Sequence, residues 1–381
     1  MKLLKEYQAG KIFEKNGFLV PVLSGSSKEM GIQYGALMVD HMQQAWDVIA
    51  EPQVKKGLIT NEVIHSWVER AFSTASIRNK LFYEGVAQGS GWLLNKVIML
   101  DQVMEFGVFQ AKLHSFAGCT STLSWGSDSV DGGMYIGRNM DWSPEFCEFP
   151  TVLTVRKPHD GSLKLATVGW PGMYCAFTAM NEKGVYLDVH DGTSMGGSVV
   201  FFERPSMVNL LTDFMSESTS LSPLLARLNG TLNSTSIIFS LADEKRGVSM
   251  ECSSLSGNRL RIANGDSIVI VNSFLGQDWG IGKRDTVSNS LKRYSNMNAR
   301  LAECKGKVNT KAVQDMFDLR LFNDDGTFAE KGGATKPTNQ DVDLTNHTVV
   351  SDINRRKMWI KIPVPEYFTD WTEFDLNELW Q

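Results

Sequence analysis

Two stretches of sequence decide the fold of this chain: GCTSTLS at residues 118–124 and GRNMDW at residues 137–142. Each combines small, β-branched and apolar residues as a strand does, and turn-forming Gly, Asp and Ser residues separate them. If the two stretches pair as a hairpin, Arg138 and Asp141 return to the end at which Cys119 lies. A thiol beside a guanidinium has a depressed pKa, so the pattern predicts a reactive cysteine.

The hydrophobic pattern changes at this point of the chain. Before about residue 115 it indicates helices: Ser26 and Glu29 have the spacing of a capping box, Thr60 caps a second helix, and a third helical region runs from Leu93 to about Leu113. After residue 118, short β-like runs are separated by turns, at 120–124, 134–136, 151–155, 163–168, 185–189, 236–241, 248–252 and 268–271. Helical stretches interrupt these runs at 207–215, 221–228 and 311–317. This order favours an α+β layered sandwich.

Charge and cysteine content exclude several classes of protein. The 381 residues include 38 Lys and Arg against 43 Asp and Glu, a net charge of −5, and no basic stripe indicates a nucleic-acid partner. Five cysteines are too few, and odd in number, for a disulfide scaffold, and no CxxC pair indicates zinc.

The sequence carries no membrane-span signal, because its apolar runs fall far short of the ~18 residues that a spanning helix needs. The first eight residues carry charge where a signal peptide has its apolar stretch. As written, the chain is therefore expected in the cytoplasm, and in the periplasm or outside the cell if a leader was removed.

Five ordered segments resemble known enzymes. Residues 118–120 followed by 137–141 resemble the nucleophile region of choloylglycine hydrolases and penicillin V acylases, which are N-terminal-nucleophile (Ntn) hydrolases, and the likeness continues at 180–184, 269–273 and 292–294. The part before Cys119 is similar to the pro-segment of the acyl-CoA:6-aminopenicillanic acid acyltransferase family, at 24–35 and 97–106. Together the segments span most of the chain.

The resemblance implies a four-layer αββα Ntn-hydrolase sandwich with antiparallel sheets. It divides the chain into a helical pro-segment, residues 1–118, and a catalytic part, residues 119–381, within one structural domain. The nucleophile of such an enzyme is an N-terminal residue, so we expect the precursor to cut itself between Gly118 and Cys119. A glycine at 118 suits this reaction because it tolerates a strained turn and leaves its carbonyl open to attack.

The freed α-amino group then takes the place of a separate base. Its unperturbed pKa of roughly 7.7–8.0 lies close to operating pH, so it can accept the thiol proton without any histidine. No cofactor is expected. The expected substrate is a small N-acyl amide, and a homo-oligomer is an open alternative.

The resemblance also assigns roles to residues by position. Asn272 matches the side-chain donor of the oxyanion hole, Asp141 holds the Cys119 amine, and Arg138 and Arg293 line the pocket of the thiol. Asp191 falls where choloylglycine hydrolases usually carry Asn and contribute a backbone N–H to the oxyanion. The acyltransferases have Gln in place of Arg138, so the residues of the site favour the hydrolases.

Four functions follow from these residues. An autoprocessed amidohydrolase would open linear C–N bonds through an acyl-thioenzyme, and an acyltransferase would pass the same acyl group to an amine or thiol. A metal-dependent hydrolase would use Asp188, His190 and Asp191 as ligands, of which 188 and 190 share one face of a strand. A non-catalytic relic would bind lipid or peptide in the same cleft.

The substrate is open at this stage. Aromatic residues cluster after the expected site, and they are candidates both for an apolar acyl pocket and for ordinary core: Trp142, Phe146, Phe149, Trp170, Tyr174 and Phe177. Of these, Trp142 and Tyr174 are the expected substrate contacts.

Overall fold

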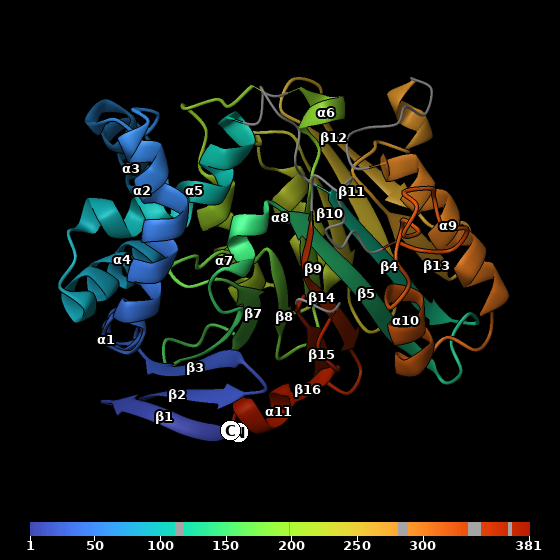
Figure 1. The fold of residues 1–381 in the computed structure, drawn as a ribbon, viewed down its shortest axis with the longest axis horizontal. Coiled ribbons are helices and arrows are strands. Elements are labelled where there is room, and N and C mark those ends of the chain that lie inside the picture. Colours follow the sequence, from blue (N-terminus) through green and yellow to red (C-terminus); the bar gives the residue numbers. More distant parts are fainter. Residues whose placement is uncertain (111–117, 198, 281–288, 334–343, 365–367) are drawn as a thin grey trace.

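Two β-sheets packed face to face form the centre of the molecule (Figure 1). The computed structural model describes residues 1–110, 118–197, 199–280, 289–333, 344–364 and 368–381. The larger sheet has ten strands in the order β1-β2-β3-β6-β7-β8-β9-β10-β11-β12, and the smaller has six in the order β13-β4-β5-β14-β15-β16. Neighbouring strands are antiparallel apart from β3 and β6, which are parallel.

The strand bounds of the larger sheet are β1 (Lys2–Tyr7), β2 (Gly10–Lys15), β3 (Phe18–Gly25), β6 (Val152–Pro158), β7 (Leu165–Gly169), β8 (Thr178–Asn181), β9 (Tyr186–Asp191), β10 (Ile237–Ala242), β11 (Gly247–Ser253) and β12 (Gly257–Ile262). Those of the smaller sheet are β4 (Gly118–Gly126), β5 (Gly132–Trp142), β13 (Ser267–Ile270), β14 (Leu344–Asp352), β15 (Lys357–Lys361) and β16 (Thr372–Asp375). Every β-like run expected after residue 118 overlaps one of these strands and extends beyond it by at most two residues.

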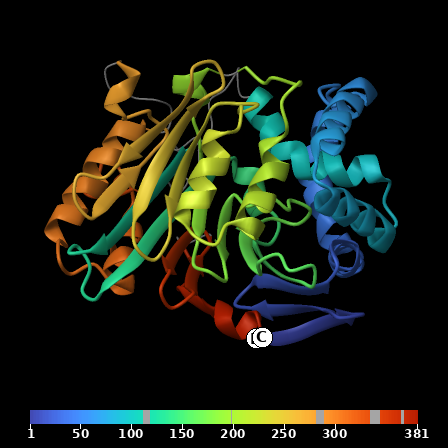
Figure 2. The ribbon, with the colours of Figure 1, turned by 180° about the vertical axis from the view of Figure 1, so that it is seen from behind.

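Helices cover both outer faces of the paired sheets. Helices α9 (Ser290–Glu303) and α10 (Thr310–Phe317) pack on the smaller sheet through an apolar cluster that includes Met297 and Phe317. Helices α7 (Met207–Glu217) and α8 (Leu221–Asn229) pack on the larger sheet, where Figure 2 shows them in yellow-green. The expected four-layer αββα sandwich is therefore confirmed, and a third apolar cluster fills the space between the sheets.

A further helical layer flanks the sandwich and comes from the chain before Cys119. It contains α1 (Ser27–Ala45), a π-helical turn η1 (Trp46–Ala50), α2 (Glu51–Lys55), α3 (Asn61–Thr74), α4 (Ile77–Ser90) and α5 (Leu94–Gln110). The capping box is present, since Ser26 N donates to Glu29 at 2.7 Å and Glu29 N donates to Ser26 Oγ at 3.3 Å. Thr60 caps α3 as expected. Residues 111–113, the last part of the third expected helix, lie outside the described residues.

Helices α1 and α4 touch along a seam of glycines. A Cβ on Gly31 or Gly35 would collide with backbone of α4, and a Cβ on Gly85 or Gly89 would collide with backbone of α1. The stretch around Gly89 is therefore the end of a helix that packs unusually close to its neighbour, and Gly91, at φ 72°, is its C-cap.

The expectation that the chain is helical up to residue 115 is wrong for the first 25 residues. They form β1, β2 and β3, and β3 pairs with β6 from the part of the chain after Cys119. The sheet of the catalytic part thus includes a strand of the expected pro-segment. Short helical turns complete the fold at α6 (Thr193–Gly196), α11 (Leu376–Leu379), η2 (Pro144–Cys147) and η3 (Gln277–Trp279).

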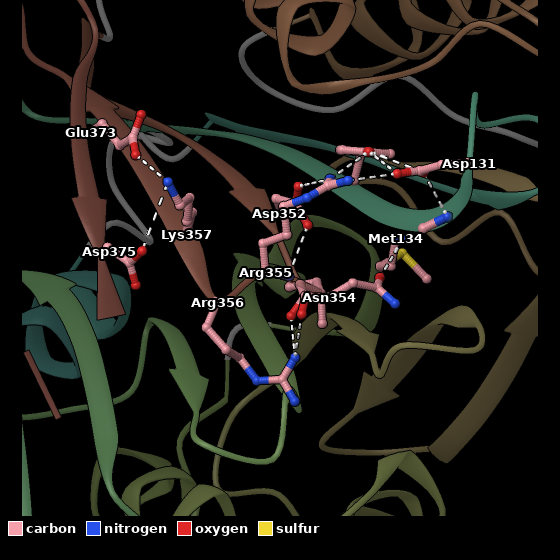
Figure 3. Close-up of polar contacts among 12 residues, drawn as sticks. Asp131, Met134, Asp352, Asn354, Arg355, Arg356, Lys357, Glu373 and Asp375 are labelled. Atoms are coloured by element: carbon pink, nitrogen blue, oxygen red, sulfur yellow. Dashed lines mark hydrogen bonds and ion pairs between the residues drawn. The ribbon is translucent and has the colours of Figure 1, made fainter. Parts of the chain in front are cut away.

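A network of charged residues fixes the turn between β14 and β15 (Figure 3). Arg355 binds Asp352 at 2.6 Å and Asp131 at 2.9 Å, and Lys357 binds Glu373 at 2.6 Å. Because β14 pairs with β5, this network helps to hold the strand that carries Arg138. Among the helices of the described residues, none is long and apolar enough to cross a membrane.

Candidate active site

Cys119 lies at the start of β4, where the expected hairpin brings the polar residues of β5 beside it. The register pairs Gly118 with Asp141 and Cys119 with Met140, which confirms that Arg138 and Asp141 return to this end. The Cys119 side chain is buried and its Sγ lies 3.9 Å from Met140 Sδ.

Asn272, two residues after the end of β13, holds the backbone at the start of β4. Its Oδ1 accepts a hydrogen bond from Cys119 N at 2.7 Å, and its Nδ2 donates one to the Asp191 carbonyl at 3.0 Å. An amide nitrogen carries two hydrogens, so one donor of Nδ2 is left for a further acceptor. Asn272 therefore lies against the proposed nucleophile with a donor to spare.

Arg293 of α9 reaches the same backbone from the outer side of the smaller sheet. It donates to the carbonyl of Cys119, to Thr120 Oγ1 at 2.6 Å and to Asn272 Oδ1 at 2.9 Å. The guanidinium is fully buried. It places a positive charge beside Cys119 and orients the Asn272 amide.

Arg138 approaches the thiol from β5. Its Nε donates to Thr178 Oγ1 at 2.9 Å and its Nη2 to the Val189 carbonyl at 2.8 Å, and the charge of the guanidinium acts on the Cys119 thiol. Burial nevertheless raises the pKa of the Cys119 thiol above its usual value, and Asp141 adds to this, while Arg138 and Arg293 only partly offset it. The expectation of a depressed thiol pKa is thus wrong, because desolvation outweighs the two cations.

Asp141 is fully buried beside this backbone. Its Oδ1 accepts a hydrogen bond from Thr345 Oγ1 at 2.5 Å. In the uncut backbone the N–H of Cys119 donates to Asn272. That Asp141 holds the amine freed by cleavage stays a prediction. Asp141 acts on Cys119 through its nearby charge.

A pocket with about 580 Å³ of empty space, including the part open to solvent, lies over Cys119. Its walls are mainly apolar and include Met140, Trp142, Phe177, Met207, Val208 and Ile237. Trp142 lines it as expected. The structure does not bring Tyr174 there, since that ring packs against Tyr34 and Phe82 among the helices before Cys119.

Asp191 lines the pocket, but its carboxylate is hydrogen-bonded to Thr193, two residues further along the chain. Oδ1 accepts from Thr193 N at 2.9 Å and Oδ2 from Thr193 Oγ1 at 3.1 Å, and burial raises the pKa of this carboxyl. The Asp191 carbonyl is already bound by Asn272.

Asp188 and His190 form a buried pair rather than a metal centre. His190 Nε2 lies 2.8 Å from Asp188 Oδ1, and Ser121 Oγ donates to Asp188 Oδ2 at 2.9 Å. Across the described ranges, no group of three or more His, Cys, Asp or Glu side chains could hold a metal ion. The three ligands of the metal-dependent alternative are not brought together.

One wall of the pocket was not predicted from the sequence. Met104 and Glu105 of α5 line it, although α5 precedes Cys119 in the chain. Glu105 is buried, forms an ion pair with Arg70 at 2.6 Å and accepts a hydrogen bond from Ser206 at 2.7 Å. Two carboxylates four residues apart, Asp101 and Glu105, within the mainly apolar run 97–106 were the available signal.

A family model matches the part of the chain that carries four of these residues. The model described as acyl-coenzyme A:6-aminopenicillanic acid acyl-transferase matches residues 129–367, which include Arg138, Asp141, Asn272 and Arg293. The match begins after Cys119. No curated protein sequence matches the chain.

Several solved structures resemble the fold distantly. A mutant conjugated bile acid hydrolase from Clostridium perfringens has a TM-score of 0.44 at 12% identity, covering 69% of this chain and 94% of its own. An N-acylethanolamine-hydrolyzing acid amidase ortholog from Caenorhabditis elegans has 0.44 at 15%, covering 69% and 97%. Penicillin V acylase from Agrobacterium tumefaciens has 0.40 at 12%, covering 68% and 87%. Likenesses this distant say nothing about the substrate of this chain.

Proposed function

This chain belongs to the acyl-coenzyme A:6-aminopenicillanic acid acyl-transferase family, and we propose that it is a self-cleaving Ntn enzyme that opens the linear amide bond of N-acyl compounds with Cys119. The observation that carries the proposal is the convergence on Cys119 of two buried cations, Arg138 and Arg293, and the amide of Asn272, beside an apolar pocket.

Activation begins at the peptide bond between Gly118 and Cys119. The thiol attacks the Gly118 carbonyl, the C–N bond breaks as the acyl group moves to sulfur, and the nitrogen leaves as an amine. Water then hydrolyses the thioester, which releases the Gly118 carboxylate and restores the thiol. Asn272 Oδ1, which accepts from Cys119 N at 2.7 Å, is placed to hold the new amine.

The thiol of Cys119 needs a base, because burial raises its pKa and keeps it protonated. The new α-amino group takes that proton, and the thiolate attacks the acyl carbonyl of the substrate. The free donor of Asn272 Nδ2 stabilises the resulting oxyanion, a role worth about 3–4 kcal/mol in such sites. The C–N bond then breaks, and the leaving amine takes the proton from the α-ammonium group.

In an amidohydrolase, water hydrolyses the acyl-thioenzyme. Water attacks the thioester with the α-amine as base, the carboxylic acid leaves and the thiol is restored. An acyltransferase is the second candidate, because the family model describes that reaction, in which an amine or thiol replaces the water. The apolar walls at Met207, Val208 and Ile237 suit an uncharged apolar acyl group in either case.

The first part of the chain stays with the second after cleavage in this proposal. Strand β3 pairs with β6, and Met104 and Glu105 form one wall of the pocket. Losing residues 1–118 would expose a sheet edge and open the acyl pocket.

A panel of N-acyl amides tests the function. Purified protein should release primary amine from at least one apolar acyl amide, and Cys119→Ala should release none. Cys147→Ala is the matched control, because Cys147 is an exposed cysteine away from the pocket, and its activity should equal that of the wild type. Amine release by Cys119→Ala would refute the proposal, and acyl product that depends on added amine would select the transferase.

A further inference from the structure

A second, polar pocket lies between the helices before Cys119 and the layers after it. Its empty volume is about 380 Å³, including the part open to solvent, and it shares no lining residue with the pocket over Cys119. Ser27 of α1 and Arg78 of α4 line one side, and Arg156 of β6 and Asp213 of α7 line the other. It therefore spans the boundary between the two expected pieces of the chain.

Arg156 is the unusual residue of this pocket. Its side chain is buried, with 7% of the residue exposed, and its guanidinium packs over the Phe82 ring at 4.3 Å from the centroid. Nη2 donates to the Tyr174 carbonyl at 3.1 Å, while Nε has no hydrogen-bond partner in the part of the chain that is described. Buried polar groups are normally paired, so an open donor here indicates an absent partner.

No carboxylate within the described ranges lies within 4.0 Å of the Arg156 guanidinium. Asp101 is the carboxylate whose charge acts most on it, but that carboxylate is bound by Tyr83 and, at 2.6 Å, by Tyr174 N. A buried cation without a close counter-ion is costly for a fold. The free-energy cost of burying the Arg156 charge falls if an anion occupies the pocket.

Two helix N-termini face the same space. Ser27 is the first residue of α1, and Arg78 and Asn79 lie in the first turn of α4, so the positive ends of both helix dipoles adjoin the pocket. Ser162 adds a hydroxyl group.

One carboxylate that lines the pocket, that of Asp213, would repel a bound anion. Asp213 accepts hydrogen bonds from Ser76 at 3.0 Å and Asn79 at 3.1 Å, and its Oδ1 lies 3.8 Å from Arg78 Nε. Arg78 also pairs with Glu217. Asp213 is thus partly balanced by Arg78 and by the charge of Arg156, while the Arg156 Nε keeps no hydrogen-bond partner in the part of the chain that is described.

We propose that this pocket binds a small oxyanion, a carboxylate or phosphate group, through the Arg156 guanidinium and the N-terminal ends of α1 and α4. The bound anion would join elements on both sides of the boundary at Cys119 and stabilise their contact. The site is independent of the proposed catalysis, since it needs neither cleavage nor the thiol.

Thermal unfolding of the full chain tests the site, with sodium phosphate or sodium acetate added at constant ionic strength in a chloride buffer. The melting temperature of the wild type should rise with at least one of the two oxyanions, and Arg156→Met should abolish the rise. Arg355→Gln is the matched control, because Arg355 is an exposed, ion-paired arginine outside the pocket, and it should keep the full rise. A wild type that responds to neither anion, or a response that survives in Arg156→Met, overturns the proposal.

Asp213→Asn gives a test that loss of folding cannot imitate. Removing this negative charge from the pocket should tighten phosphate or acetate binding by about threefold or more, as measured by calorimetric titration. Unchanged or weaker binding contradicts an anion site at Arg156, even if Arg156→Met fails to fold.

Discussion

The backbone N–H of Cys119 donates a hydrogen bond to Asn272 Oδ1 at 2.7 Å, across 153 residues of sequence. Through its Nδ2 the same side chain binds the Asp191 carbonyl at the end of β9. Asn272 therefore connects the start of β4 with the larger sheet at the mouth of the pocket. In the proposed mechanism it holds the nucleophile on one side and meets the oxyanion on the other.

Replacing Asn272 by Ala should lower kcat by about 10²–10³, because an oxyanion donor is lost. The rate is measured on the released amine and normalised to the fraction of chain that has been cut, which a denaturing gel gives. Asn298→Ala is the control, since Asn298 is exposed on α9, and it should leave kcat unchanged. A kcat for Asn272→Ala within twofold of wild type would exclude the oxyanion role.

Filling the pocket should change the preferred acyl length. Val208 of α7 lines the pocket, so the substitution Val208→Trp reduces the space for the acyl chain. We expect kcat/KM for long acyl amides to fall about tenfold or more, since overpacking excludes the chain end, while short acyl amides react as before. Steady-state kinetics on a series of acyl lengths measures this, and an equal loss at every length would argue against acyl binding there.

His347 should make the fold sensitive to mild acid. Burial lowers the pKa of this side chain from 6.5 to about 3, and both ring nitrogens lack partners in the described residues. Below pH 6.5 the unfolded chain gains a proton that the folded protein does not, so stability falls as the pH drops towards 3, by about 1.4 kcal/mol per pH unit.

The substitution His347→Phe keeps the contact with Trp170 and should flatten this pH dependence between pH 6 and 4, measured by denaturant unfolding at each pH. His65 is exposed on α3, so His65→Phe serves as the control and should leave the slope unchanged. An unaltered slope in His347→Phe would contradict the assignment.

The glycine seam between α1 and α4 should not accept a methyl group. Gly89→Ala places a Cβ against the carbonyl of Ile32, so we expect a loss of about 1–3 kcal/mol in the free energy of unfolding. Gly230→Ala is the control, because its Cβ meets no heavy atom closer than 3.3 Å in a right-handed backbone. Equal stability of the two variants would show that the helices can separate at little cost.

Local patterns in the sequence predicted much of the fold, including the hairpin that brings Arg138 and Asp141 to the end at which Cys119 lies. The hairpin at Cys119 was predictable because strand composition and turn residues act within a few residues of each other. The capping box at Ser26 was predictable for the same reason. The positions of Asn272 and Arg293 came from the family resemblance, since no local pattern links them to Cys119.

Elements that form through contacts with other segments of the chain were not predicted from the sequence. Strand β1 is exposed along its whole length, so it shows no alternation of buried and exposed residues, and it exists because it pairs with β2. Helix α4 was missed because glycines, not a row of large apolar residues, form its contact with α1. The raised pKa of the Cys119 thiol could not be predicted from the sequence either, because its main cause is burial of the side chain.

Self-cleavage before Cys119 is the central claim, and the intact mass of purified, active protein under denaturing conditions tests it most directly. The account predicts two polypeptides, residues 1–118 and 119–381, for the wild type and a single chain for Cys119→Ala. A fully active preparation that contains only the unbroken chain of 381 residues would contradict it.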